Sequence, residues 1–235
     1  GDVRRARLYV TSLGVHEIRL NGKRIGDQLL APGWTTYGQR LLADTYDVTP
    51  LLRSGRNAIG AMLCDGWYRG RVGWGEPDRC RYGEDVALIA QLEVELVDGR
   101  TIAVGSDGTW RASTAEIQRA DLYDGALVDR RLHKPGWDRP GFDDAAWVPV
   151  AVVPFDHALI EPRTAPPVRV VATWPVDLVP ATDGRIRLDT GQNLAGLLGF
   201  ITDVHSLGLP TAQGLIFTET FYWDQDEAAR AAEKR

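Results

Sequence analysis

Residues 31–74 combine aromatic side chains with glycine and charged side chains, a combination that could recognise a sugar. Indole N–H and phenol O–H groups need hydrogen-bonding partners, and glycines remove packing volume, so some of these rings are expected to line loops instead of a strand interior. A flat aromatic face can stack on the C–H face of a sugar ring, while Asp and Arg side chains bond its hydroxyl groups. The pattern therefore predicts a carbohydrate-binding surface.

The candidate binding residues all come from this stretch. They are Trp34, Tyr37, Asp44, Asp65, Trp67, Tyr68, Arg69 and Trp74. Gly66 and Gly70 lie on either side of three of them and free the backbone to turn sharply, which could project a ring from the edge of a sheet. The residues leave a second interpretation equally open, in which Trp34 and Trp67 cap the core and the Asp and Arg side chains pair with each other.

The sequence shows no arrangement of residues that predicts catalysis. An inverting glycosidase needs two carboxyl groups about 6.5 to 9.5 Å apart, whereas the adjacent pairs Glu84-Asp85 and Asp143-Asp144 would point to opposite sides of an extended chain. Cys64 and Cys80 match neither a redox motif nor a zinc motif. We therefore expect a binding role and no catalytic residue in this chain.

Composition and charge exclude several other classes of function. The formal net charge is −5 and there is no basic block, so no nucleic-acid partner is expected. No run approaches the ~20 apolar residues that a membrane helix requires, so no membrane partner is expected either. Residues 1–10 lack the apolar centre of a signal peptide, which predicts a cytoplasmic protein, although secretion stays open because a leader could have been removed.

Alternating apolar residues and short polar turns predict the elements that must position the candidate residues. Apolar positions alternate over residues 7–20 on both sides of a break at Gly14, and the Asn21-Gly22 pair that follows is a strong hairpin signal. They alternate again over residues 87–97, which lead into Asp98-Gly99, a second predicted I′-type turn. We therefore predict an all-β chain that begins with an antiparallel β-sandwich.

Prolines and changes of pattern divide the chain into four predicted segments. Residues 1–152 form the sandwich, and residues 153–167 form a Pro-rich linker, because each proline removes a backbone donor and restricts the residue before it. Residues 168–205 alternate again and are predicted to start a second β-domain. Residues 206–235 form a divergent tail that ends in a short C-terminal helix, since acids precede bases in its last twelve residues.

Several runs of sequence carry a family resemblance. They are LYVTSLGVHEIRLNGKRIGDQLLAPGW, TYDVT, NAIGAMLCDGWYRGRVGW, DLYDGALVDRR and GWDRPGFDDAAW. These runs resemble the N-terminal β-sandwich of bacterial α-L-rhamnosidases of glycoside hydrolase family 78. The later runs APPVRVVATWPVDL and IRLDTGQNLAGLLGF resemble the start of the concanavalin-like β-domain that follows it. The resemblance spans residues 5–200 and implies sandwiches of jelly-roll or concanavalin-like type.

The resemblance implies a carbohydrate function whose catalytic part lies elsewhere. In the family, an (α/α)6 barrel C-terminal to these β-domains hydrolyses terminal α-L-rhamnosides with inversion, and nothing in this chain could form that barrel. The chain is therefore expected to be a non-catalytic portion that binds rhamnose-containing carbohydrate or supports the catalytic barrel. The alternative is a purely structural module, or a truncated fragment, with no sugar affinity.

The resemblance also bears on cofactors and has two departures. Some sandwiches of the family bind rhamnose through calcium, which Asp44, Asp47 and Asp65 could help to hold, and no other cofactor is expected. Ala126 stands where relatives commonly carry Glu after the Asp-Gly of the DLYDG motif. After Asp203 the sequence is expected to leave the family pattern.

Overall fold

A computed structural model describes residues 2–73, 79–180, 186–189 and 191, which belong to two compact units that divide after Val170. The first unit contains β1 (Val3–Leu13), β2 (Val15–Leu20), β3 (Lys23–Arg24), β4 (Gln28–Leu29), β5 (Leu41–Asp47), β6 (Ile59–Cys64), α1 (Gly66–Arg69), β7 (Ala87–Leu96), β8 (Thr101–Gly105), β9 (Arg111–Ala112), β10 (Ile117–Asp121), β11 (Gly125–Val128), β12 (Val148–Pro149), β13 (Ile160–Pro162) and β14 (Val168–Arg169). Short 3₁₀ turns lie at Thr49–Leu51, Arg130–Leu132 and His157–Leu159. Among the described residues, no helix has the length and apolar character that crossing a membrane requires.

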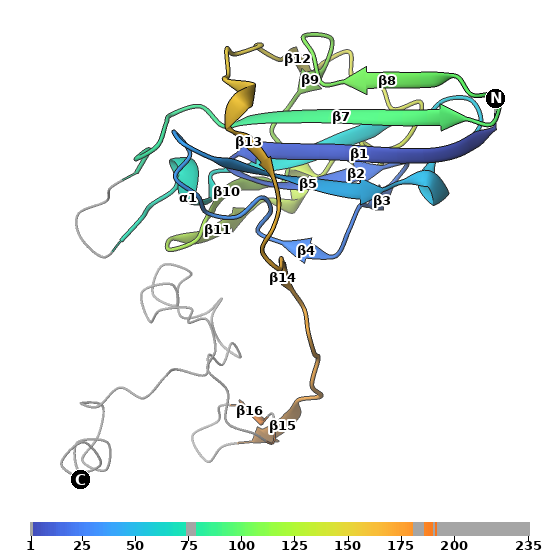
Figure 1. The fold of residues 1–235 in the computed structure, drawn as a ribbon. Helices are drawn as coiled ribbons and strands as arrows, with labels where there is room; N and C mark the ends of the chain where they lie inside the picture. The colour runs from blue at the N-terminus through green and yellow to red at the C-terminus, as the bar shows by residue number, and fades with distance from the viewer. Residues whose placement is uncertain (1, 74–78, 181–185, 190, 192–235) are drawn as a thin grey trace. The chain divides into compact units, whose positions relative to one another are not determined.

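The first unit is a sandwich of two sheets that share one apolar core (Figure 1). Within the described residues, one sheet has the strand order β13-β5-β1-β7-β8 and the other the order β3-β2-β6. The buried core residues are Ala6, Leu8, Val10, Ile18, Leu20, Ile25, Val48, Ala90, Leu92, Val94 and Leu96. A fully buried leucine such as Leu8 contributes about 2 kcal/mol. The predicted all-β antiparallel sandwich is confirmed, although β13 pairs with β5 in parallel.

Glycine allows the chain to leave one sheet and enter the other. Gly14 lies between β1 and β2 with φ of +129°, and a Cβ there would lie 2.4 Å from the backbone oxygen of Cys64. After β2, Asn21 and Gly22 have φ of 54° and 83°, which are the two positive values of a type I′ turn. The predicted break and the predicted first hairpin are therefore both present, and β3 pairs with β2.

The second predicted hairpin forms, but through a different turn. On β7, Ala90, Leu92, Val94 and Leu96 are buried, as their alternation predicts. Strand β8 follows and pairs with β7, with Glu95 opposite Thr101. Only Gly99 of the Asp98-Gly99 pair has a positive φ, of +86°, so the predicted I′ type is wrong. The loop is longer than two residues, because Leu96 donates from its backbone N–H to the oxygen of Arg100 at 2.8 Å.

Residues 153–170 belong to the first unit and pair with its earlier strands. β13 pairs with β5, and β14 pairs with β4, with Val168 opposite Leu29. The structure thus places strand pairing inside the range that proline content alone predicts to be a linker. A segment can carry several prolines and still pair at a sheet edge, because an edge strand needs only some of its N–H groups.

The second unit is described over a short hairpin. β15 (Asp177–Pro180) pairs antiparallel with β16 (Ile186–Asp189), with Asp177 opposite Asp189. This hairpin lies within residues 168–205, the range predicted to start a second β-domain, whereas Val168 and Arg169 at the start of that range pair with β4 of the first unit. The predicted tail and helix at 206–235 lie outside the described residues.

Candidate functional site

Two tryptophans from separate parts of the sequence stack on each other, and one of them, Trp67, belongs to the helix α1. The rings of Trp34 and Trp67 lie with centroids 6.0 Å apart and planes 7° from parallel. Trp34 is 51% exposed, and its Nε1–H donates to the hydroxyl oxygen of Tyr82 at 3.0 Å. One indole is therefore held by a stacked ring on one side and a hydrogen bond at its edge while it remains open to solvent.

Three tyrosines form the support beneath this stack. Tyr37 is buried and meets the rings of Tyr68 and Tyr82 edge-on, at centroid distances of 5.1 and 5.0 Å. Its hydroxyl donates to the backbone oxygen of Gly33 at 3.2 Å. Burial raises the pKa of Tyr37, and burial followed by the charge of Asp85 raises the pKa of Tyr68, so both keep their protons. Tyr37 thus connects Tyr82, the hydrogen-bonding partner of Trp34, to Tyr68 on α1.

Glycines fix the position of the α1 segment. Gly66 has φ of +53°, and a Cβ there would lie 2.4 Å from a methyl group of Val15 on β2. Gly83 approaches Tyr68 so closely that a Cβ would lie 2.1 Å from the tyrosine oxygen. Glycine at these two positions therefore lets α1 and the Tyr68 ring lie against the sandwich, whereas the sequence predicts that the glycines around Trp67 project a ring from the sheet edge.

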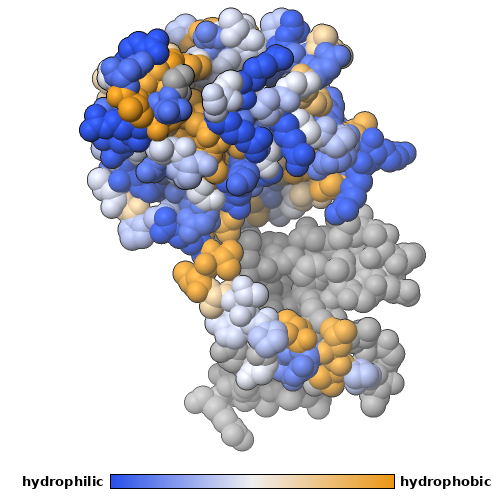
Figure 2. All heavy atoms as spheres, turned by 90° about the vertical axis from the view of Figure 1, so that its right-hand side faces the viewer, coloured by the Kyte–Doolittle hydropathy of each residue, from blue (hydrophilic) through white to orange (hydrophobic). Residues whose placement is uncertain are grey.

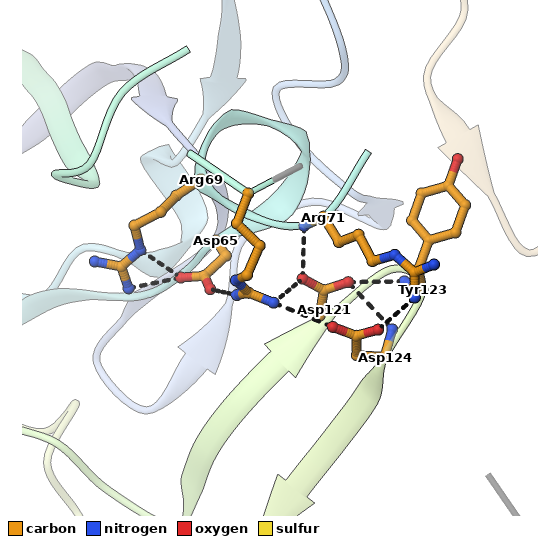
Figure 3. A network of polar contacts seen from close by, with 7 residues as sticks. Asp65, Arg69, Arg71, Asp121, Tyr123 and Asp124 are labelled. Carbon is orange, nitrogen blue, oxygen red and sulfur yellow. Dashed lines mark hydrogen bonds and ion pairs between the residues drawn. The ribbon is translucent and has the colours of Figure 1, made fainter. Parts of the chain in front are cut away.

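A network of ion pairs joins α1 to the β10–β11 hairpin (Figure 3). Asp65 binds Arg69 at 2.6 Å and Arg79 at 2.8 Å. Arg79 continues to Asp121 at 2.9 Å and to Asp124 at 3.2 Å. One guanidinium thus bridges three carboxylates that lie on two different elements.

Asp121 is the buried centre of this network. Its carboxylate accepts hydrogen bonds from the backbone N–H groups of Arg71 at 2.8 Å and Tyr123 at 2.9 Å. Burial acts to raise its pKa, but these backbone hydrogen bonds, one from Asp124 and the charge of Arg79 outweigh burial and lower the pKa. Asp121 and Asp124 open and close the Asp-Leu-Tyr-Asp of the DLYDG motif, so that motif is an anchor for α1.

The predicted site residues separate into three groups. Trp34, Tyr37, Trp67 and Tyr68 come together in the aromatic cluster, and Asp65 and Arg69 pair with each other beside it. Asp44 lies elsewhere: it is buried on β5 and paired with Arg163, which also donates to the backbone oxygen of Pro32 at 2.6 Å. Trp74 lies outside the described residues.

Sequence reasoning missed Tyr82, Arg79 and Asp121. Tyr82 could have been found from the Tyr-Gly pair at 82–83, which resembles the glycine-flanked pattern of residues 66–70. The ion-pair partners give no such local signal, because Arg79 and Asp121 are 42 residues apart. The pairing of Asp65 with arginines agrees with the second interpretation of the charged residues, whereas the exposure of Trp34 agrees with the first.

The described part of the chain holds no group of three or more His, Cys, Asp or Glu side chains arranged to bind a metal ion. The three carboxylates considered for calcium have separate partners. Asp44 faces Arg163, Asp65 faces two arginines, and Asp47 accepts from the hydroxyl of Thr49 at 2.6 Å. Within the described residues, these three carboxylates therefore do not converge on one site.

Comparisons with known proteins agree with the sequence motifs. The chain matches the family described as Alpha-L-rhamnosidase N-terminal domain over residues 1–172. It is 46% identical over 198 residues to an α-L-rhamnosidase of Streptomyces avermitilis, covering 83% of this chain and 19% of that protein. It is 33% identical over 241 residues to an α-L-rhamnosidase of Formosa agariphila, covering 99% of this chain and 26% of that protein. The second alignment continues past Asp203, where the resemblance was expected to end.

Solved structures give the same relationship. A native α-L-rhamnosidase of Aspergillus terreus superposes with a TM-score of 0.78 at 39% identity, covering 82% of this chain and 22% of that one. The Streptomyces avermitilis enzyme complexed with L-rhamnose gives 0.75 at 44% identity, covering 82% and 19%. The chain thus spans between 19% and 26% of the length of these relatives. By its sequence, its sandwich and these matches, the chain belongs to the α-L-rhamnosidase N-terminal domain family.

Proposed function

We propose that this chain is a non-catalytic part of an α-L-rhamnosidase-like glycoside hydrolase and that it binds rhamnose-containing carbohydrate on the open face of Trp34. The observation that carries the proposal is that the Trp34 ring is half exposed although it stacks on Trp67 and donates a hydrogen bond to Tyr82. Ordering a free tryptophan costs conformational entropy on binding, and a ring that is already fixed avoids that cost.

The chemistry of rhamnose suits such a surface. A 6-deoxy sugar has a methyl group and C–H faces that can lie on an indole, and hydroxyl groups that need directional partners. The hydroxyl of Tyr82 borders the Trp34 ring, and Arg69 lies on α1 close to Trp67 in sequence. A solved relative from Streptomyces avermitilis is a complex with L-rhamnose, which makes this sugar the natural ligand to test.

Calorimetric titration with L-rhamnose tests the proposal. Trp34→Ala should weaken binding at least tenfold, which corresponds to about 1.4 kcal/mol, because it removes the stacking face. Trp174→Ala is the matched control, since Trp174 is 48% exposed and belongs to the second unit. Equal affinities for Trp34→Ala and the unaltered chain would refute the proposal.

A second function, support of the catalytic barrel in a longer polypeptide, has its own observation. Ile102 and Val104 on the edge strand β8 are each 47% exposed, although they pair with Val94 and Leu92, whose side chains are buried in the core. Directly paired residues face the same side of a sheet. Ile102 and Val104 therefore lie on the face of the sheet that packs on the core, but at a position where the first unit leaves them exposed. Apolar residues reach the surface of the first unit among hydrophilic ones (Figure 2), and the exposed pair Ile102 and Val104 on one face of β8 fits packing against another domain.

A further inference from the structure

A cleft with a volume of about 420 Å³ opens on the first unit, apart from the aromatic cluster. Residues of β4 and β5 line it, together with residues of the segment 162–169. None of the aromatic cluster residues Trp34, Tyr37, Trp67, Tyr68 and Tyr82 lines the cleft. Pockets that hold small ligands have volumes of about 300 to 1,000 Å³, so one or two sugar rings would fit in it.

A buried ion pair stands in the wall of the cleft. Asp44, which is 3% exposed, binds Arg163 through two hydrogen bonds, one of them at 3.1 Å from Nη2. The same Nη2 donates to the oxygen of Pro32. Arg163 Nη1 has no hydrogen-bonding partner among the described residues, although a planar guanidinium offers five donors. A firmly held guanidinium that lines the cleft thus keeps one unpaired nitrogen within the described part of the chain.

Further polar groups line the cleft, and their charges balance. Asp27 and Arg169 form an exposed pair at 2.8 Å between Oδ1 and Nε, and within the described residues the two terminal nitrogens of Arg169 have no hydrogen-bonding partner. The two arginines and two aspartates that line the cleft sum to zero charge. A lining with donors and acceptors but no net charge suits a neutral ligand with many hydroxyl groups. An ionised ligand would be attracted by one member of each ion pair and repelled by the other, so it would gain little from the charges.

An aromatic ring and prolines supply the apolar part of the lining. Tyr46 accepts a hydrogen bond from Gln28 Nε2, and burial, followed by the charge of Asp44, raises the pKa of its hydroxyl, which therefore keeps a proton to donate. A Cβ at Gly26 would lie 2.4 Å from the Tyr46 ring, so glycine at this position keeps the ring in its place. Pro162 and Pro167 add C–H surface to the lining.

From this lining we infer that the cleft is a second carbohydrate subsite, which takes a neutral pyranose ring between Tyr46 and the segment 162–169. It is distinct from the Trp34 surface, because none of the residues of the aromatic cluster lines the cleft. A glycan-binding domain with two such sites would hold two sugar residues of a chain, or two chains, at separate points.

Titration of the ¹⁵N-labelled chain with L-rhamnose, followed by NMR, distinguishes the two sites. Backbone amide signals of Gln28, Thr45 and Tyr46 should shift and saturate, and these shifts should persist in Trp34→Ala. Thr45 on β5 also lines the cleft and offers a hydroxyl group. Arg169→Gln and, as a second variant, Thr45→Val should each lower the affinity measured from these signals at least fivefold. Arg100→Gln is the matched control, because Arg100 is an exposed arginine that pairs with Asp98, away from the cleft.

Three results would overturn the inference. The first is an absence of shifts at Gln28, Thr45 and Tyr46 in the folded chain at saturating L-rhamnose. The second is unchanged affinity of the cleft signals in both Arg169→Gln and Thr45→Val. The third is a clear preference of these signals for D-glucuronate over L-rhamnose, which would show an anion site. If the signals of Gln28, Thr45 and Tyr46 shift but the Nε1–H signal of Trp34 does not, the proposed function is refuted and the inference about the cleft is supported.

Discussion

At the scale of single residues, His16 links the core to the loop that carries Trp34. Its backbone N–H donates to the oxygen of Ala31 at 2.8 Å, and its Nδ1 lies 2.8 Å from the hydroxyl oxygen of Ser12. Burial lowers the pKa of His16 to about 4, with a smaller opposing influence from Asp44. The imidazole therefore stays neutral near pH 7 and acts as a structural group.

The depressed pKa of His16 predicts a loss of stability in mild acid. His16 takes up a proton near pH 6.5 in the unfolded chain but only near pH 4 in the folded chain. The neutral imidazole therefore makes its full contribution to the stability of the fold above pH 6.5, and this contribution is lost as the pH falls toward 4. The loss over this window should be about 3 kcal/mol in the free energy of unfolding. Urea denaturation at several pH values measures it.

His16→Gln provides the control for this measurement, since it removes the titrating group and keeps a polar side chain. The free energy of unfolding of the variant should decline less steeply between pH 6.5 and 4 than that of the unaltered chain. Parallel curves for the two proteins would contradict the assignment.

At the scale of elements, the β10–β11 hairpin determines where α1 lies. Arg79 joins them by binding Asp65 on one side and Asp121 on the other. Arg79→Gln should destabilise the fold by about 2 kcal/mol, less than for a fully buried pair because Arg79 is partly exposed. Arg131→Gln, which removes an arginine that is 88% exposed and pairs with Asp129, should change stability by less than about 0.5 kcal/mol. Chemical denaturation compares the two, and equal effects would show that the network does not hold α1.

The elements also show what the sequence can predict. Alternation over residues 7–20 and 87–97 predicts strands, because burial of one strand face leaves a pattern in consecutive residues. The Asn21-Gly22 pair predicts a hairpin, because these two residue types tolerate the positive φ values of a tight turn. The pairing of Asp44 with Arg163 joins residues 119 apart, and proline content hides the return of residues 160–169 to the sheets. The aromatic residues were identified from their types, but only the fold shows that Trp34 stacks on Trp67 and that Asp44 belongs to the cleft.

At the scale of the whole molecule, the exposed apolar side chains of Ile102 and Val104 on β8 allow a test of the supporting role. If β8 packs on a catalytic barrel, Ile102→Ser with Val104→Ser should weaken association with a rhamnosidase catalytic domain supplied in trans at least tenfold, since it removes apolar contact area. Val171→Ser is the control, because Val171 is an exposed valine of the second unit. Pull-down or light scattering measures the association, and equal association for the two variants would contradict support through β8.

The central claim is that a fixed, half-exposed indole on this sandwich stacks on a sugar. Its most direct test is the Nε1–H signal of Trp34 in ¹⁵N NMR spectra, assigned with Trp34→Phe and followed during titration with L-rhamnose. We predict that this signal shifts progressively and saturates while the Trp174 signal stays in place. A Trp34 signal that does not move at saturating sugar would contradict the claim.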